Sequence, residues 1–294
     1  MLTEEQMMMY EIGLSTNGKE IGEELFAKYE KAGITAMEIA VAPEQYDILD
    51  YKRLRRQAAT HNVRLWSLHL PFRPETRVNM AASDKNIRKN TVEYYTDIIK
   101  KASDVGIKIF VVHSNCSEPV EEDEMRDERI DMVRECLDAL AENAYREGAN
   151  IAVENLPRSC IGRNSAELQR VLAVNSKLRV CYDTNHLMGE TAQDFIRAVG
   201  DKIVTVHISD YDYMNERHWL PGEGKLDWQE ILQNLKAVKY NGVWLYEIRF
   251  SCPKTIIRDR ELTCEDFVRN AKEIFENRPI SVFSKHKEKL GMWG

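Results

Sequence analysis

Short runs of β-branched and aromatic residues recur along this chain, and each is followed by a longer stretch with helical spacing of its apolar residues. This alternation is typical of repeated βα units around a parallel sheet. Runs such as IKIFVVH and KIVTVHI are nearly continuous in apolar residues, as expected of strands covered on both faces. We predict eight strands, at Tyr10–Leu14, Ala36–Ile39, Leu65–His69, Ile107–His113, Ile151–Glu154, Arg179–Asp183, Ile203–His207 and Val243–Glu247.

The number of predicted strands and the chain length of 294 residues together indicate the architecture. Eight parallel strands close into a barrel, and such barrels commonly run past about 250 residues as one domain. We therefore predict the α/β class and a (β/α)₈ TIM barrel, with one domain over residues 1–294. Residues 278–294 are expected to form a C-terminal tail that packs on the barrel or on a neighbouring subunit.

Helix boundary signals support this count. Ser and Asp residues stand where helices are expected to begin, and Gly residues stand where they are expected to end. The expected helices are Ser83–Val105, about Glu122–Gly148, one from Ser165, one from Asp227, and about Leu262–Asn277.

The composition excludes several classes of protein. A formal net charge of -7 argues against a nucleic-acid partner, because binding to phosphates requires a surplus of basic residues. The acidic run Glu118–Arg129 is interpreted as a solvated helix start. Neither a signal peptide nor a membrane-spanning stretch is recognisable, so no membrane partner is expected. No C-x-x-C pair occurs, and we expect a cytoplasmic protein with six reduced cysteines: Cys116, Cys136, Cys160, Cys181, Cys252 and Cys264.

Titratable residues end six of the predicted strands. In a barrel of this kind the C-terminal ends of the strands converge on one mouth, where the active site lies. A lone carboxylate at a strand end is more often a helix cap, and a lone histidine is more often a satisfied core residue. Several carboxylates at one rim, however, would raise each other's pKa unless a cation lay among them. The set therefore favours a divalent metal ion, and it comprises His69, His113, Glu154, Asp183, His207 and Glu247.

Three carboxylates and one imidazole in this set predict the metal ligands, namely Glu154, Asp183, His207 and Glu247. A mostly oxygen ligand set with open positions suits Mn²⁺, Mg²⁺ or Co²⁺ better than a closed structural zinc. Two glutamates on opposite sides of a substrate could also transfer protons, one removing a proton next to a carbonyl and the other returning it. Isomerisation and epimerisation of ketoses both fit this chemistry.

Five segments resemble successive blocks of the xylose isomerase-like sugar isomerase/epimerase superfamily, to which endonuclease IV also belongs. They are IAVEN, VCYDTNH, VTVHISD, ERHWLPGEGKLDW and GVWLYEIR, and the similarity extends from the first strand to about Glu247. The resemblance implies that Glu154 and Glu247 act as acid and base and that His186 contacts substrate hydroxyls. Enzymes of this superfamily commonly form dimers or tetramers, so a homo-oligomer is possible. Arg249 is a further candidate for the substrate, or else for a salt bridge with a rim acid.

Endonuclease IV provides the alternative interpretation, a zinc phosphoesterase. The chain departs from that enzyme at Glu216-Arg217-His218, where the enzyme has Asp-x-His, and it also lacks a basic surplus for DNA. The chain resembles that enzyme at the positions that hold its three zinc ions, which correspond here to His69, His113, Glu154, Asp183, His186, His207, His218 and Glu247.

The favoured hypothesis is a divalent-metal-dependent isomerase or epimerase of a sugar or sugar derivative, which proceeds by proton transfer between the two glutamates through a metal-stabilised enediolate. A lyase of the keto-inositol dehydratase type would use the same acid and base. In the favoured hypothesis His69, His113 and His218 line the sugar pocket. The loops Pro71–Ala82 and Tyr211–Lys225 supply aromatic residues that either stack on the sugar or pack as a lid, namely Phe72, Tyr211, Tyr213 and Trp219.

Overall fold

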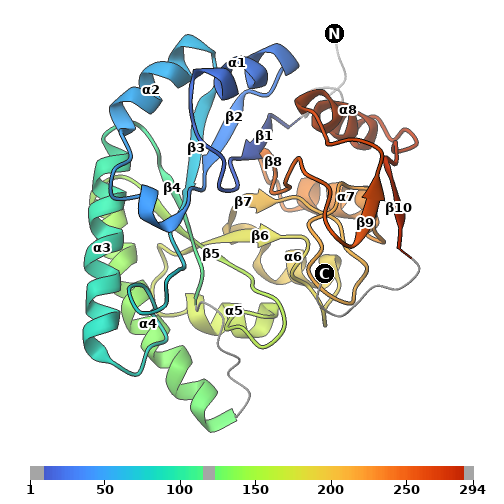
Figure 1. Ribbon diagram of the computed structural model, residues 1–294. Coiled ribbons are helices and arrows are strands. Elements are labelled where there is room, and N and C mark those ends of the chain that lie inside the picture. Colours follow the sequence, from blue (N-terminus) through green and yellow to red (C-terminus); the bar gives the residue numbers. More distant parts are fainter. Residues whose placement is uncertain (1–9, 115–122, 288–294) are drawn as a thin grey trace.

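Eight parallel strands alternate with helices around a nearly closed barrel in the computed structural model, which describes residues 10–114 and 123–287 (Figure 1). The strand order is β7-β6-β5-β4-β3-β2-β1-β8, and Ile208 closes the ring because its N–H donates to Leu245 O at 2.8 Å. This confirms the predicted (β/α)₈ barrel. The strands are β1 (Ile12–Ser15), β2 (Ala36–Ile39), β3 (Arg64–His69), β4 (Ile109–Val112), β5 (Asn150–Glu154), β6 (Arg179–Asp183), β7 (Ile203–His207) and β8 (Trp244–Tyr246).

Helices surround the barrel, and their starts follow from the capping chemistry of the sequence. The Asp84 carboxylate accepts a hydrogen bond from Asn86 N at 2.8 Å, and the Asp227 carboxylate accepts from two backbone N–H groups of its helix. These caps lie one residue before the helix, so the predicted starts were one or two residues early. The helices are α1 (Glu23–Ala32), α2 (Tyr51–Thr60), α3 (Lys85–Ser103), α4 (Asp123–Arg146), α5 (Ser165–Leu172), α6 (Ala192–Val199), α7 (Trp228–Ala237) and α8 (Cys264–Phe275).

Side chains of each strand alternate between the barrel interior and the layer under the helices. On β4, for example, Phe110 and Val112 join the large apolar cluster beneath the helices, whereas Ile109 and Val111 pack in the interior. The same alternation brings Glu154 and Asp183, the last residues of β5 and β6, to the interior at the C-terminal end of the barrel. Because side chains alternate in direction along a strand, only every second residue of a strand can point into the mouth.

The lower part of the interior, which we call the floor, is apolar. It is formed by Ile109, Val111, Ala152 and Cys181, with Trp66 and Val204 packed against them. Both Trp66 and Val204 lie where the strand register shifts by one residue, and such bulges change the direction of a side chain. Trp66 also contacts a second interior group of Ala36, Val243 and Leu245, so it fills the barrel from side to side.

Strand ends differ slightly from the prediction. Tyr10 was expected in the first strand, but its ring packs against Tyr240 and Trp244 at centroid distances of 5.6 and 6.0 Å, and the strand begins at Ile12. His113 and Glu247 lie one residue beyond β4 and β8 rather than at their last positions. Both remain at the mouth.

After the barrel, β9 (Ile256–Arg258) and β10 (Ser284–His286) pair as a two-stranded antiparallel sheet with α8 between them in the sequence, so part of the expected tail is a strand. The N-terminal residues 1–9, Cys116, the first residues of the acidic run and residues 288–294 lie outside the described part of the chain. Within the described part, no helix is both long and apolar enough to cross a membrane.

Candidate metal centre and substrate site

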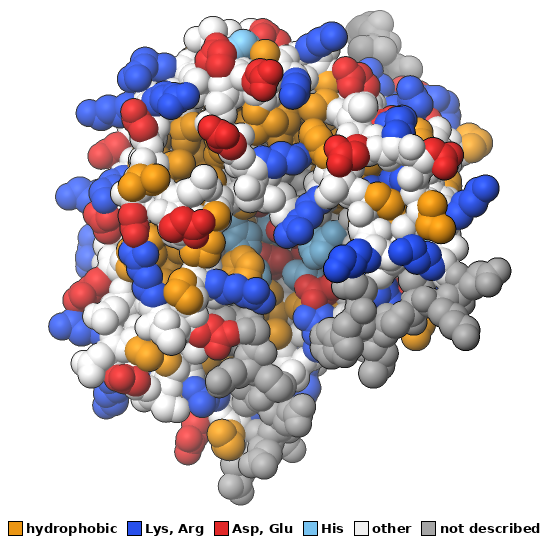
Figure 2. All heavy atoms as spheres, viewed as in Figure 1, with side chains coloured by type: hydrophobic (Ala, Val, Ile, Leu, Met, Phe, Trp, Pro, Cys, Tyr) orange, Lys and Arg blue, Asp and Glu red, His pale blue; other side chains and the backbone are white. Residues whose placement is uncertain are grey.

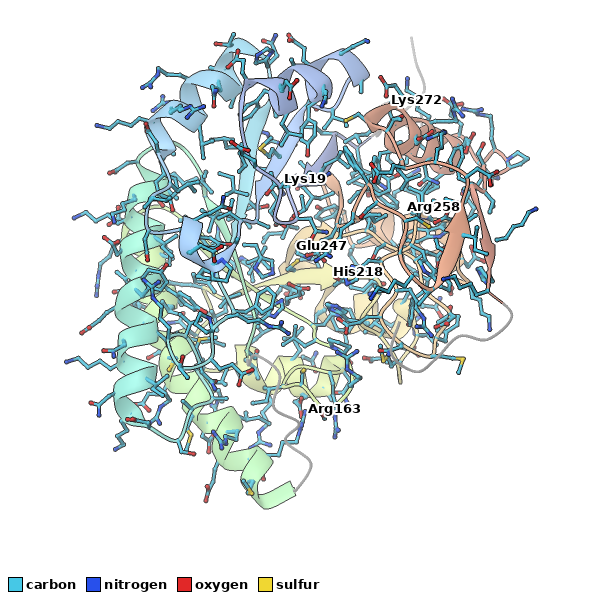
Figure 3. All side chains as sticks on the ribbon, in the orientation of Figure 1. Lys19, Arg163, His218, Glu247, Arg258 and Lys272 are labelled. Atoms are coloured by element: carbon cyan, nitrogen blue, oxygen red, sulfur yellow. The ribbon has the colours of Figure 1, made fainter. Side chains whose placement is uncertain are left out.

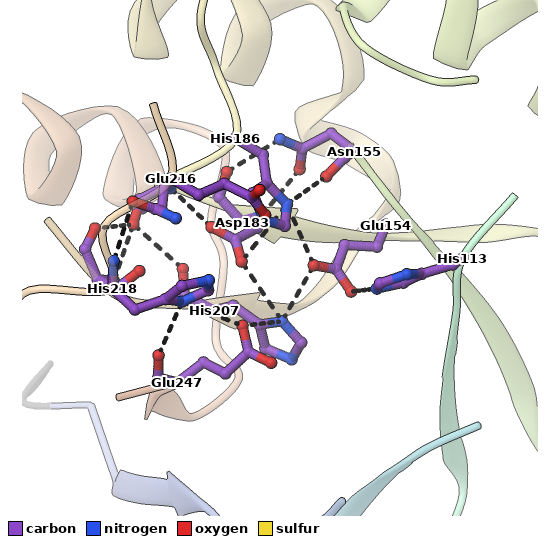
Figure 4. Close-up of polar contacts among 12 residues, drawn as sticks. His113, Glu154, Asn155, Asp183, His186, His207, Glu216, His218 and Glu247 are labelled. Carbon is purple, nitrogen blue, oxygen red and sulfur yellow. Dashed lines mark hydrogen bonds and ion pairs between the residues drawn. The ribbon is translucent and has the colours of Figure 1, made fainter. Parts of the chain in front are cut away.

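The strand-end residues surround a hollow in the face shown in Figure 2, where histidine side chains lie around acidic ones. The four residues predicted as metal ligands come together there: one ligand atom from each of Glu154, Asp183, His207 and Glu247 lies within 4.8 Å of the others. His207 Nδ1 lies 3.4 Å from Glu154 Oε1, 3.8 Å from Asp183 Oδ2 and 3.5 Å from Glu247 Oε2 (Figure 4). Three strands, β5, β6 and β7, and the residue after β8 supply this group.

Burial of these four side chains without a cation costs free energy. The side chains of Asp183 and His207 are fully buried, that of Glu154 is 1% exposed and that of Glu247 is 17% exposed. Asp183 Oδ2, Glu154 Oε2 and His207 Nδ1 have no hydrogen-bond partner of ordinary geometry among the described residues. Buried polar atoms without partners cost about 1–3 kcal/mol each. Oxygen and imidazole atoms that converge in this way fit a divalent ion, which would satisfy all of them.

The sequence argument expects raised pKa values at a rim without a cation, and two of the three carboxylates follow it. Burial raises the pKa of Asp183 to about 6, and burial together with Glu154 and Asp183 raises the pKa of Glu247 to about 7. Burial also acts on Glu154, but the neighbouring His207 and His113 outweigh it and hold the pKa of Glu154 well below its usual range. The pKa values of the two glutamates of one site are therefore shifted in opposite directions.

His69 and His113 approach the same carboxylate from the side of β3 and β4. Their Nε2 atoms each lie 3.3 Å from Glu154 Oε2. His69 Nδ1 lies 2.8 Å from Leu70 O, which fixes the ring, and Phe72 stacks on His113 with ring centroids 4.4 Å apart. Together with Glu154 the two histidines form a second group that could hold a metal ion.

His186 and His218 lie on the opposite side and form a third such group with Glu216. His186 Nδ1 lies 2.9 Å from Asn155 O and 3.3 Å from Glu154 Oε1, while its Nε2 lies 3.0 Å from Glu216 Oε1. His218 Nδ1 lies 3.2 Å from Glu247 O, and Figure 3 shows His218 and Glu247 next to each other. The sequence treated Glu216 as a departure from a motif, but the structure brings it into contact with His186.

Two asparagines that the sequence analysis missed hold these residues in place. The Asn155 side chain accepts from Asp183 N at 2.8 Å and donates to Asp183 O at 2.9 Å, so it ties β5 to β6 beside the carboxylates. The Asn185 Oδ1 atom accepts from Arg217 N at 3.0 Å and thereby anchors the loop that carries Glu216. Both asparagines follow a strand-end carboxylate by one or two positions, which is the signal that could have identified them.

Glu38 is the other residue that the sequence did not predict. It lies on β2 one residue before the strand ends, and its carboxylate is fully buried. It accepts a hydrogen bond from Ser67 Oγ at 2.8 Å and lies 3.1 Å from His207 Nε2. Glu38 thus contacts Nε2 of His207, the ring nitrogen that faces away from the other three residues of the group.

Arg249 and the four aromatic candidates differ in their exposure and in their contacts with the mouth. Arg249 is exposed, and no ion pair or hydrogen bond joins it to another described residue. Tyr211 and Trp219 are fully buried, and Tyr213 is exposed beside α6, where it lines a surface pocket. Of the four aromatic candidates, only Phe72 contacts a histidine of the mouth.

The fold and the mouth together define a class, namely (β/α)₈ barrels with a carboxylate and histidine site at the C-terminal ends of their strands. A family model described as xylose isomerase-like TIM barrel matches residues 26–265, and the chain belongs to this family.

Several proteins are similar to this chain in sequence or in structure. An uncharacterised protein of Methanocaldococcus jannaschii is 28% identical over 184 residues, which cover 60% of this chain and 61% of that protein. The chain is also similar to D-psicose 3-epimerase of Ruminiclostridium cellulolyticum, with 25% identity over 73% of this chain and 74% of the epimerase. Among solved structures, a D-tagatose 3-epimerase-like protein superposes with a TM-score of 0.74 at 22% identity, covering 92% of this chain and 96% of that one. The chain is thus similar in sequence to a sugar epimerase and shares its fold with an epimerase-like protein.

Proposed function

We propose that the protein is a divalent-metal-dependent epimerase or isomerase of a sugar or sugar derivative. The observation that carries this proposal is the convergence of Glu154, Asp183, His207 and Glu247 at the mouth of the barrel. Mn²⁺, Mg²⁺ or Co²⁺ suits three carboxylates and one imidazole with open positions left for substrate. When bound, such an ion supplies positive charge that stabilises negative charge developing on substrate oxygens.

Glu154 and Glu247 are the proposed proton-transfer pair. They approach His207 Nδ1 from different strands, so they face a substrate in the mouth from different sides. One of the two glutamates removes a proton next to the substrate carbonyl as a general base, and the other returns a proton as a general acid. A proton removed from the carbon next to a carbonyl and returned on the opposite face inverts that carbon. Return to the neighbouring carbon instead converts a ketose to an aldose.

Other residues of the mouth would bind the substrate. His186 and His218 offer ring nitrogens to hydroxyl groups on one side, and His69 and His113 do so on the other. Phe72 adds an apolar surface beside His113, and Arg249 is free to reach a substrate that extends out of the mouth. We expect a cytoplasmic enzyme, which is consistent with free cysteines at Cys136, Cys160, Cys181, Cys252 and Cys264.

The direct test is exchange of a substrate proton with solvent. The protein is supplied with Mn²⁺ or Co²⁺ in D₂O together with D-psicose, D-fructose or D-tagatose, and proton NMR follows the carbons next to the carbonyl. The proposal predicts deuterium incorporation and formation of an epimer or aldose. Glu154→Gln and Glu247→Gln should each abolish the exchange, because each removes one partner of the pair.

Glu273→Gln is the matched control. Glu273 is also a buried glutamate, but it lies on α8 outside the barrel, where it accepts from Ser281 N and Ser281 Oγ at 2.8 Å. Exchange should survive in this variant. Absence of exchange across a broad panel of ketoses, aldoses and inososes would contradict the proposal, and so would exchange that is unchanged in Glu154→Gln.

A zinc phosphoesterase is the second candidate function, and two of the other groups of possible ligands favour it. Glu154 with His69 and His113, and Glu216 with His186 and His218, could each hold an ion beside the four-residue group. The acidic net charge of -7 and the similarity to sugar epimerases weigh against it. This candidate predicts incision of duplex DNA at an abasic site and two or three zinc ions per chain. A dehydratase would instead yield an unsaturated product from an inosose in the exchange assay.

A further inference from the structure

The glutamate beneath His207 has no role in the proposed acid–base chemistry. Glu38 lies on β2, is fully buried and contacts His207 on the side opposite to the other three residues of the group. Both of its oxygens lie 3.1 Å from His207 Nε2, and one also accepts from Ser67 Oγ at 2.8 Å. Among the described residues this carboxylate has only a hydroxyl and an imidazole as donors, and a buried carboxylate with so few donors needs both of them.

This contact decides which nitrogen of His207 can face the other three residues of the group. A carboxylate is an acceptor only, so the hydrogen bond to Glu38 requires a proton on Nε2. With Nε2 protonated, the neutral ring presents its lone pair at Nδ1, which faces Glu154, Asp183 and Glu247. The His69 ring stacks beside the His207 ring, with centroids 5.9 Å apart and an interplanar angle of 18°, which limits rotation of the ring.

We propose that Glu38 is a positioning residue for metal binding: it orients His207 and fixes its tautomer so that Nδ1 is the atom that binds the ion. Glu38 is not itself a ligand, because its contact is with the opposite ring nitrogen. This inference rests on the proposed role of His207 as a ligand. A carboxylate in this position also makes the imidazole more basic, and loss of such a partner typically weakens metal binding by about 10- to 100-fold.

Metal binding tests the inference without any substrate. The dissociation constant of Mn²⁺ is measured by calorimetry and electron paramagnetic resonance for wild type, Glu38→Gln and Glu273→Gln. The control is close, because Glu273 is a buried glutamate that accepts from a serine hydroxyl at 2.8 Å, as Glu38 does. We expect the affinity to fall about 10- to 100-fold in Glu38→Gln and to stay within twofold of wild type in Glu273→Gln.

The tautomer gives a readout that a merely structural role would not change. In histidine-labelled protein loaded with Zn²⁺, nitrogen NMR should show His207 with a protonated Nε2 and with Nδ1 shifted by the ion. The His207→Asn variant identifies the signal. Binding of the ion at Nε2 would overturn the inference.

Unchanged Mn²⁺ affinity in a folded Glu38→Gln variant would also overturn it. If wild type binds no Mn²⁺ at all, the proposed function fails together with the inference, whereas binding in wild type with no effect of Glu38→Gln rejects only the inference. Should Glu38→Gln not fold, Glu38→Asp replaces it. That change keeps the charge but moves it away from Nε2 by one methylene, and the same loss of affinity is expected.

Discussion

The inward-facing residues of β5 and β6 change character within two positions. Ala152 and Cys181 pack into the apolar floor, and Glu154 and Asp183 stand in the mouth directly above them. The floor contains side chains that stabilise the fold by burial, whereas the mouth contains buried polar atoms that have no hydrogen-bond partner in the described part of the chain. Residues that stabilise the fold and residues that could bind a metal ion thus lie at different heights along the barrel axis. Substitutions in the floor should lower the free energy of unfolding, and substitutions in the mouth should lower Mn²⁺ affinity.

The largest effect on folding is expected in the floor. Ile109→Ala removes a side chain that packs in the interior with Val111 and Trp66. The free energy of unfolding should fall by about 2–5 kcal/mol, because the closed barrel cannot collapse around the cavity. Chemical denaturation measures this change, and Mn²⁺ affinity should remain that of wild type. A loss of metal affinity comparable to that of a ligand variant would show that the two levels are not separable.

A substitution in the mouth should behave in the opposite way. Asp183→Asn removes a buried charge whose Oδ2 has no hydrogen-bond partner among the described residues. Mn²⁺ affinity should fall by at least about 100-fold, since a ligand is lost. The metal-free protein should be as stable as wild type or more stable by up to about 1 kcal/mol. A strong loss of stability in the metal-free variant would mean that Asp183 supports the fold.

The pH dependence of the free energy of unfolding provides a further test of the mouth. Burial raises the pKa of Glu247 to about 7, so its protonated form favours the folded state. The corresponding stability is fully present below the ordinary glutamate pKa and is lost as the pH rises through about 7. The Glu247→Gln variant should not lose this stability, because a glutamine side chain does not ionise.

Thermal unfolding of the metal-free proteins measures this difference between pH 5 and pH 8. The melting temperature of Glu247→Gln should rise relative to wild type as the pH increases, and Mn²⁺ should reverse the order at pH 8 by stabilising wild type. A difference that does not depend on pH would contradict the assigned direction of the pKa shift.

The smallest effect is expected from a polar contact within the floor. Trp66 Nε1 donates a hydrogen bond to Thr205 Oγ1 at 3.0 Å. Thr205→Val leaves this donor without its acceptor and should lower the free energy of unfolding by about 1 kcal/mol. Mn²⁺ affinity should not change. A variant of undiminished stability would indicate that the indole finds another acceptor.

The sequence predicted the barrel and most of the mouth because both follow from local patterns. Strands β2, β6 and β7 begin and end where predicted, and β6 and β7 end in the residues expected at the mouth, Asp183 and His207. Glu38 was missed because it is not the last residue of its strand, and its approach to His207 spans 169 positions of the chain. The register shift opposite Trp66 also affects its neighbours on β3, and no local pattern predicts such a shift.

The positions of the aromatic candidates and of Glu216 could not be predicted from the sequence for a different reason, because these residues lie in loops. Trp219 was a candidate for stacking on the sugar, but its indole is fully buried and donates to Thr255 Oγ1 at 2.9 Å. Glu216 reaches His186 because Asn185 anchors the loop after β7. Long loops take such conformations from tertiary contacts, which a single sequence does not reveal.

The metal content of the protein distinguishes a single-ion site at the mouth from a cluster of zinc ions. Plasma mass spectrometry of protein purified without chelator, followed by titration with Mn²⁺, gives the number of ions per chain in wild type, in Asp183→Asn and in the double variant His69→Ala, His113→Ala. We expect one ion per chain, lost in Asp183→Asn and retained in the double variant. No bound ion in wild type, or two to three zinc ions per chain that fall in the double variant, would contradict it.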